Sequence, residues 1–408
     1  MKEEEEIGIY VHIPFCVAKC PYCDFNSIAV SPIPEVDYTK ALIKEINSSC
    51  TKPLTLPFSS STEGRQGAKK SLFLEKNNKK TTSIYFGGGT PSLFSVESIA
   101  KVLDRVMSEF SLTSNVEISL EVNPKTADIE KLKSLNTIGI NRLSIGVQSF
   151  QDKFLQTLGR IHSSVDAVNL FNNARSSGYS NIGLDLIFGI PGQSLDDWER
   201  DLDFALSLKP EHISIYNLTI EKDTPFNYLQ EKGEIILPDE DVQIRMYTLT
   251  QQKVSAAGYE QYEISNFALP DFRCIHNEGY WTLKEYLGFG AGAHSYLKDR
   301  TNWGIRWENT PNPYEYISLL SNNVTAVIEA EELTREAVIK EAIFLGLRRL
   351  EGISLDYFEE IFNISLEETF ANVIPYLLKE NLISIDKGYL KLTVRGILLS
   401  NEVFLNFF

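Results

Sequence analysis

The chain has 408 residues, of which 43% are hydrophobic and 23% are charged. These values are typical of a globular protein and exclude a disordered or fibrous one. The formal net charge of −16 disfavours broad binding of nucleic acid through its phosphates. No apolar run is long enough to cross a bilayer, and Lys2 is followed by four glutamates where a secretory signal would have an apolar core. We therefore expect a cytoplasmic protein of two or three domains.

The first two thirds of the chain alternate short strand patterns with helix-length patterns. The predicted strands are Gly8–Ile13, Ser83–Phe86, Val116–Glu121, Arg142–Gly146, Ile182–Ile187 and His212–Asn217. The predicted helices are Asp37–Ile46, Ser95–Met107, Ala127–Leu135, Val165–Ser176 and Leu195–Leu206. This alternation indicates an α/β fold with a parallel sheet, either open or closed into a partial (β/α) barrel. In such sheets the functional residues lie at the carboxyl ends of the strands.

The pattern changes after about Leu237, where a helix over Pro238–Ala257 is predicted. From residue 332 onward helices dominate, and two short strands flank Asp386-Lys387-Gly388, which is a hairpin signal. The predicted elements there are Thr334–Leu347, Leu355–Ile361, Leu366–Leu378, Leu382–Ile385 and Tyr389–Thr393. We predict a core over residues 1–237, a linking segment over 238–330 and a mixed, mainly helical C-terminal domain over 331–408 with a winged-helix-like end.

Residues 51–80 interrupt this order, because they are rich in Ser, Thr, Lys and Asn and carry seven basic but only two acidic residues. We predict an exposed insertion, most simply a solvated loop. A role in binding a partner or a membrane surface is the alternative.

Three of the five cysteines, Cys16, Cys20 and Cys23, fall within eight residues directly after the first predicted strand. The other two, Cys50 and Cys274, are isolated. An odd and clustered set indicates a metal site in a reducing compartment more than a disulfide framework.

The cysteine spacing leaves two kinds of metal centre open. A structural zinc ion normally takes four ligands, for which His12 and Asp24 are the nearest further candidates. His12 shares a strand face with Tyr10, and we expect it to be a hydrogen-bonded strand residue, whereas Asp24 could cap the loop. An iron–sulfur cubane held by three cysteines instead leaves one iron open to an exogenous chelating ligand.

Polar and glycine residues follow several of the predicted strands. Gly87-Gly88-Gly89-Thr90 forms a turn whose backbone could approach a ligand closely, although it could equally be a tight strand–helix turn. Glu121, Gln148, Arg160 and Asp185 end or interrupt apolar runs. They could cap helices or form ion pairs, Glu121 with Arg160 for example, or they could surround a common ligand.

The Cys-x3-Cys-x2-Cys motif after the first strand of an α/β chain resembles the radical SAM superfamily, over roughly the first 240 residues. The resemblance implies a [4Fe-4S] cluster, held by Cys16, Cys20 and Cys23, whose open iron is chelated by S-adenosyl-L-methionine (SAM). It also implies a set of SAM contacts, among which Thr219 is the weakest match because one branch of the superfamily, the oxygen-independent coproporphyrinogen III oxidases, has a small apolar residue there. These contacts are Tyr10, Tyr22, Gly88, Gly89, Thr90, Glu121, Gln148, Arg160, Asp185 and Thr219.

Several sequence segments, such as Asp185-Leu-Ile-Phe-Gly-Ile-Pro191, are similar to those of one branch of the superfamily. This branch contains the oxygen-independent coproporphyrinogen III oxidase and the heme chaperone HemW. Three features favour the chaperone. Phe25 stands where the oxidase has a further cysteine, only nine residues precede Tyr10, and His276-Asn-Glu-Gly-Tyr280-Trp281 resembles the chaperone's His-Asn-x-x-Tyr-Trp element. The resemblance thus implies heme contacts at His276, Tyr280 and Trp281.

Other interpretations of the last element stay open. His276 could be a surface residue, Tyr280 and Trp281 could form a domain-junction core, and Cys274 is an alternative soft ligand for heme iron. The nearby glycines before His294 do not satisfy Gly-x-Gly-x-x-Gly, so a turn is favoured over a dinucleotide site.

These observations together favour a heme chaperone that binds the cluster, SAM and one heme and passes the heme to an acceptor protein. The resemblance suggests a membrane respiratory component as the acceptor, and with it a peripheral contact with the membrane. Two alternatives remain: a coproporphyrinogen III oxidase, which Phe25 and the short N-terminal segment disfavour, and a zinc-bound interaction module.

Overall fold

The computed structural model describes residues 5–51, 54–57, 69–72, 79–298 and 303–408. Within these ranges the largest sheet has the strand order β11-β12-β10-β9-β8-β7-β6-β1-β13-β14-β15-β16. All six strands predicted in the first part of the chain form and lie side by side in parallel. Their bounds are β1 (Glu5–Ile13), β6 (Lys79–Gly88), β7 (Ser111–Val122), β8 (Arg142–Gln148), β9 (Ile182–Phe188) and β10 (His212–Asn217).

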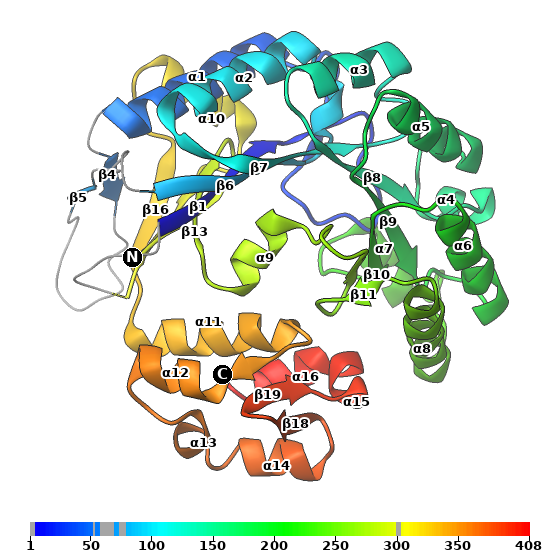
Figure 1. The fold of residues 1–408 in the computed structure, drawn as a ribbon. Helices are drawn as coiled ribbons and strands as arrows, with labels where there is room; N and C mark the ends of the chain where they lie inside the picture. Colours follow the sequence, from blue (N-terminus) through cyan, green and yellow to red (C-terminus); the bar gives the residue numbers. More distant parts are fainter. Residues whose placement is uncertain (1–4, 52–53, 58–68, 73–78, 299–302) are drawn as a thin grey trace.

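Helices cover the outer side of this curved sheet, as the predicted alternation requires (Figure 1). Serine or aspartate N-caps begin several of them; Ser95, for example, accepts a hydrogen bond from the backbone N–H of Ser98. The outer helices are α1 (Glu35–Thr51), α2 (Val96–Glu109), α3 (Ile129–Thr137), α5 (Ser164–Ser176), α6 (Leu195–Ser207) and α8 (Glu240–Ala256). Two shorter helices, α4 (Asp152–Thr157) and α7 (Pro225–Glu231), lie in loops that the sequence left unassigned.

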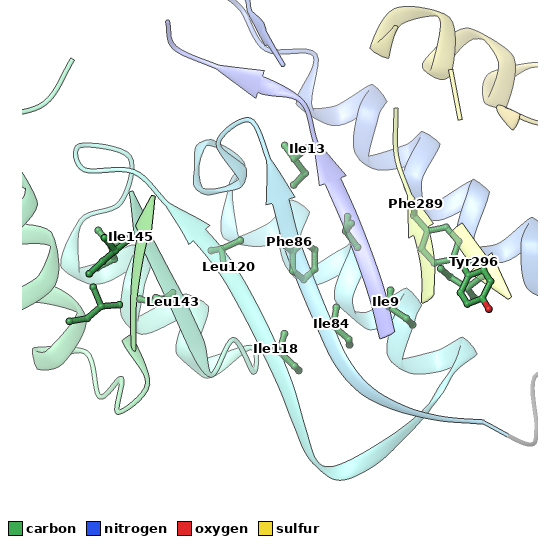
Figure 2. Close-up of a cluster of buried hydrophobic side chains, with 14 of the residues drawn as sticks. Ile9, Ile13, Ile84, Phe86, Ile118, Leu120, Leu143, Ile145, Phe289 and Tyr296 are labelled. Atoms are coloured by element: carbon green, nitrogen blue, oxygen red, sulfur yellow. The ribbon is translucent and has the colours of Figure 1, made fainter. Parts of the chain in front are cut away.

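The parallel strands have two chemically different faces, because successive side chains on a strand point in opposite directions. Ile9 and Ile13 of β1, with Ile84 and Phe86 of β6, belong to the apolar layer that packs against the outer helices (Figure 2). The layer continues through Ile118, Leu120, Leu143 and Ile145. The alternate residues, such as Tyr10, therefore point to the inner side of the barrel.

The sheet continues past β1 through a region in which the sequence had predicted no strands. β13 (Glu285–Phe289) pairs in parallel with β1, and the following strands are antiparallel. The extension comprises β14 (His294–Leu297), β15 (Ile305–Asn309) and β16 (Val327–Glu332), and the other edge carries β11 (Glu260–Gln261) and β12 (Asn266–Ala268). Helix α10 (Pro313–Ser321) packs on α1, whereas the short helix α9 (Ile275–Trp281) lies inside the curve of the sheet (Figure 1).

The C-terminal region is mainly helical and has a three-stranded antiparallel sheet. Its elements are α11 (Arg335–Arg348), β17 (Ile353–Ser354), α12 (Leu355–Phe362), α13 (Leu366–Thr369), α14 (Ile374–Lys379), β18 (Ile383–Asp386), β19 (Tyr389–Leu392), α15 (Val394–Leu398) and α16 (Ser400–Leu405). The predicted hairpin is confirmed, and Lys387 and Gly388 both have positive φ at its turn. The single helix predicted over Leu366–Leu378 is wrong: it divides into α13 and α14, because Pro375 in the first turn of α14 disfavours a helix before it.

Only part of the 51–80 segment belongs to the described residues. Thr51 ends α1, β4 (Leu54–Pro57) and β5 (Lys69–Leu72) pair antiparallel, and Lys79 begins β6. The side chain of Leu56 is fully buried, so the expectation of a wholly exposed insertion is wrong at this point. The remainder of that prediction lies outside the described residues. Over the described ranges, none of the helices is both long and apolar enough to traverse a lipid bilayer.

Candidate functional site

The three clustered cysteines lie on a loop at the carboxyl end of β1. The loop is tied at its base, because β2 (Phe15–Cys16) pairs in parallel with β3 (Ile28–Ala29). Within it the N–H of Cys23 donates to the carbonyl of Cys20 at 3.1 Å. All three thiols are free and half-buried, so they are reachable for a ligand and still held in place.

Two thiols receive hydrogen bonds from other strands' loops. Thr90 Oγ1 lies 3.6 Å from Cys16 Sγ, and Arg160 Nη1 lies 3.6 Å from Cys20 Sγ. Burial raises the pKa of the Cys23 thiol. Among the described residues no three His, Cys, Asp or Glu side chains are gathered as they would be around a single ion. A cubane would take each thiolate on a different iron.

The glycine turn after β6 packs directly onto the cysteine loop. Gly88 has φ of 117°, and a Cβ there would lie 2.5 Å from the imidazole of His12. A Cβ on Gly89 would lie 2.7 Å from the carbonyl oxygen of Phe15. Only glycine allows this close approach, which leads into the short 3-10 helix Pro91–Leu93. The turn thus presents bare backbone beside the thiols.

Two carboxylates from the inner face of the sheet lie below this turn. Glu121 accepts hydrogen bonds from Tyr85 OH and from the N–H of Gly88, both at 3.1 Å. Burial, and after it the charge of Asp185, raises the pKa of Glu121 to about 7. Asp185 accepts a hydrogen bond from Ser144 Oγ at 3.1 Å, and burial raises its pKa too. The inner side thus holds two acidic groups with hydrogen-bonding capacity at the mouth of the barrel.

Arg160 provides a positive charge at this mouth of the barrel. Its Nη2 donates to Asn123 Oδ1 at 2.6 Å and to the carbonyl of Gly146 at 3.0 Å. Burial lowers the pKa of Arg160, but the nearby Tyr22 and Cys20 outweigh it and raise the pKa. The ion pair considered between Glu121 and Arg160 does not form, because Asn123 and Gly146 take the guanidinium and Tyr85 and Gly88 take the carboxylate.

Asn123 is a site residue that the sequence reasoning missed. Its Nδ2 also donates to Thr90 Oγ1 at 2.9 Å, so it connects the glycine turn to Arg160. The available signal was its place two residues after Glu121, directly after the end of the same strand.

The remaining predicted SAM contacts differ in how close they lie to this mouth. Tyr10 OH bonds to His12 Nδ1 at 2.9 Å, and His12 Nε2 bonds to the carbonyl of Asn26, so His12 is a hydrogen-bonded strand residue as expected. Tyr22 packs against Phe226 beside Cys20, where burial raises its pKa. Two contacts are less tightly tied to the centre. Gln148 has a positive φ of 68° at an irregularity of β8, and Thr219 is exposed in the loop after β10.

His276 lies on α9, inside the barrel and buried. Its ring is within hydrogen-bond distance of Ser83 Oγ through Nδ1 (2.9 Å) and of Tyr280 OH through Nε2 (3.0 Å). Burial, and after it the charge of Arg142, lowers the pKa of His276 to about 3, so the imidazole is neutral. His276 is therefore not a surface residue, and both of its nitrogens are occupied.

Two buried residues that the sequence did not single out, Glu117 and Arg142, lie at the start of α9. The carboxylate of Glu117 accepts hydrogen bonds from the N–H groups of Ile275 and His276 at 3.2 and 3.3 Å. It also accepts from the thiol of Cys274 at 3.5 Å, and Arg142 lies 3.8 Å away. Burial raises the pKa of Cys274 to about 12, which makes a ready thiolate ligand unfavourable there.

Tyr280 and Trp281 end α9 in two different surroundings. Tyr280 packs edge-on against Tyr286 of β13, with ring centres 4.8 Å apart. The guanidinium of Arg348 lies over the ring of Trp281, 4.6 Å from its centre. Trp281 thus lies at the junction with the C-terminal region, as one interpretation of the sequence had it.

Two parts of the chain match known protein families. Residues 10–205 match the radical SAM superfamily, and residues 333–399 match the HemN C-terminal domain. The heme chaperone HemW of Bacillus subtilis is 38% identical over 97% of this chain and 97% of its own length. The heme chaperone HemW of Haemophilus influenzae is 37% identical over 97% of this chain and 96% of its own.

Among solved structures, the coproporphyrinogen III oxidase HemN of Escherichia coli, described as a radical SAM enzyme, superposes with a TM-score of 0.79. The match covers 99% of this chain and 90% of the oxidase at 22% sequence identity. It confirms the predicted fold: a largely parallel radical SAM sheet with helices and a helical C-terminal region.

Proposed function

Because the chain belongs to the heme chaperone HemW family of radical SAM proteins, we propose that it binds a [4Fe-4S] cluster, SAM and one heme, and passes the heme to an acceptor protein. The binding of the cluster and SAM is supported by the loop of Cys16, Cys20 and Cys23. This loop faces Arg160 and the glycine turn across one mouth of the barrel. Membership of the superfamily implies the cluster and SAM. The heme rests on the family and on the α9 element.

The residues present fit the cluster and SAM. The three half-buried thiols would hold the cluster, which when bound supplies one electron and an iron without a cysteine ligand. The bare backbone at Gly88 and Gly89, with Thr90, would receive the amino group of SAM. Arg160 would pair with its carboxylate, as guanidinium groups do. The other proposed contacts would orient the nucleoside. They are Tyr10, Tyr22, Glu121, Gln148, Asp185 and Thr219.

We place the heme contact on α9, at His276, Tyr280 and Trp281. Neutral imidazole is a normal axial ligand of heme iron, and the aromatic rings could pack on the porphyrin face. The hydrogen bonds of His276 to Ser83 and Tyr280 set a condition on this proposal. His276 can ligate iron only after at least one of them has opened, and its burial means that α9 itself has to move.

The acceptor that we propose is a heme protein at the respiratory membrane, reached by peripheral contact. A test is the transfer of heme from the loaded chain to the detergent-solubilised apo-form of such a protein, followed by the absorption spectrum of each. No transfer to any respiratory acceptor, with transfer to an unrelated apo-hemoprotein, would contradict this choice of partner.

The likeness of the whole fold to a coproporphyrinogen III oxidase keeps one second candidate function, the oxidation of coproporphyrinogen. Against it, the position of the oxidase's further cysteine is taken by Phe25, which is 65% exposed and has no thiol. The deciding experiment gives the anaerobically reconstituted chain heme in one titration and coproporphyrinogen with SAM in another. Saturable binding of one heme without turnover supports the proposal, and conversion of coproporphyrinogen contradicts it.

A further inference from the structure

One cation of the C-terminal region connects α9 to the rest of the molecule. Arg348 is the last residue of α11, and its guanidinium lies 4.6 Å from the centre of the Trp281 ring. Its Nη2 is also 3.5 Å from Oε2 of Glu263, a side chain with no exposed surface. The backbone carbonyl of Arg348 accepts a hydrogen bond from Ile264 at 3.1 Å, which holds the same segment. Figure 1 shows α11 next to the inner helix α9.

This junction leaves polar atoms buried without partners. Trp281 Nε1 and Arg348 Nε have no hydrogen-bond partner within the described part of the chain, and neither has Glu263 Oε2 beyond its ion pair. Unsatisfied buried polar atoms are rare and costly, because water would otherwise solvate them. Opening of the junction would hydrate all three. The stacking of Arg348 on Trp281 and its pairing with Glu263 therefore hold the closed state against this cost.

The junction matters because His276 lies five residues before Trp281 on the same short helix. Glu117 holds the beginning of α9, Ser83 holds the His276 ring, and Arg348 holds the end. Of these three contacts only Arg348 belongs to the C-terminal region. We propose that Arg348 is a positioning residue that keeps α9 inside the barrel, so that the C-terminal region sets how readily heme reaches His276.

The first test measures α9 itself and does not depend on heme. Amide hydrogen exchange of residues 275–281 is compared between the full chain and Arg348→Ala, with Arg349→Ala as the matched control, since Arg349 pairs with the exposed Glu351. We expect exchange in α9 to rise about tenfold or more in Arg348→Ala, while exchange in β6 and in Arg349→Ala stays unchanged. Arg348→Gln serves if the alanine variant does not fold. Unchanged α9 exchange in the folded variants would overturn the proposal.

The second test follows from placing heme on α9, and it measures the rate of heme association with the anaerobically reconstituted chain. We expect association to be about fivefold faster in Arg348→Ala and close to the native rate in Arg348→Lys, which keeps the cation over Trp281. Faster α9 exchange with an unchanged association rate would overturn the link between this junction and heme. A native chain that binds no heme at all would instead contradict the proposed function, while the exchange result stood.

Discussion

Asp185 lies near enough to Glu121 at the barrel mouth to add to the effect of burial, so that the pKa of Glu121 rises to about 7. Two acidic groups from separate strands thus share one site, and one of them titrates near neutral pH. In the proposed site the ionised Glu121 would accept hydrogen bonds from SAM, so its titration has a direct consequence for affinity.

We predict that SAM binds about tenfold more tightly at about pH 8 than at about pH 6, because Glu121 loses its proton between them. The Glu121→Gln variant should bind SAM weakly at both values, as isothermal titration of the anaerobic protein would measure. Glu45→Gln is the matched control: Glu45 is also buried with a pKa raised to about 7, but it bonds to Tyr316 and Asn309 on the outer side of the sheet. A flat affinity profile for the native chain would contradict this role of Glu121.

Glu45 also yields a prediction about stability. Burial raises its pKa above the unfolded value, so the folded chain holds the proton more tightly. The stabilisation is complete below about pH 4.5 and is lost as the pH rises through about 7. The native chain should therefore lose about 2 kcal/mol of unfolding free energy between about pH 5 and pH 8. The Glu45→Gln variant, which has no carboxyl group there, should not show this loss. Denaturant titrations at several pH values measure it, and equal slopes would be inconsistent with a buried, protonated Glu45.

Gly88→Ala should weaken SAM binding strongly. The added Cβ would strike the His12 ring at 2.5 Å, and the backbone has a positive φ. Gly178→Ala shares the second problem only, since Gly178 has φ of 94° but nothing within 4 Å of a Cβ. The backbone strain should cost both variants about 1–2 kcal/mol of stability, but only Gly88→Ala should lose SAM affinity, by about tenfold or more. Equal SAM affinities in the two folded variants would show that the turn does not shape the site.

Arg160→Lys keeps the charge but loses the planar fork that reaches Asn123, Gly146 and Cys20 together. We expect SAM affinity to fall about tenfold, with less effect on cluster content. The control is Arg175→Lys, because Arg175 pairs with Glu211, away from the cysteine loop. Native SAM affinity in Arg160→Lys would remove Arg160 from the proposed contacts.

The sequence predicted the parallel strands well because apolar residues recur at alternate positions in them, as Val116, Ile118 and Leu120 do in β7. It missed β14 to β16 for the opposite reason: these strands are short and contain charged residues such as Arg306, Glu308 and Glu329. Their pairing depends on neighbours far away in the chain, which no local pattern records.

Part of the candidate site could also be predicted from local sequence patterns. The cysteine loop and the glycine turn are local motifs, so their residues could be named from the sequence. The contacts of His276 with Ser83 and Glu117 join residues more than 150 positions apart. For this reason the sequence could propose His276 as a heme ligand but could not tell that its ring is buried and bonded at both nitrogens.

The most direct measurement is the electron paramagnetic resonance spectrum of the anaerobically reconstituted and reduced chain, recorded with and without SAM. We predict the signal of one reduced [4Fe-4S] cluster per chain, and we predict that it shifts when SAM is added. Cys50→Ser should keep this signal, whereas replacement of Cys16, Cys20 and Cys23 by serine should remove it. A chain that takes up zinc without iron, or an iron signal that SAM leaves unchanged, would contradict a SAM-binding cluster on these three cysteines.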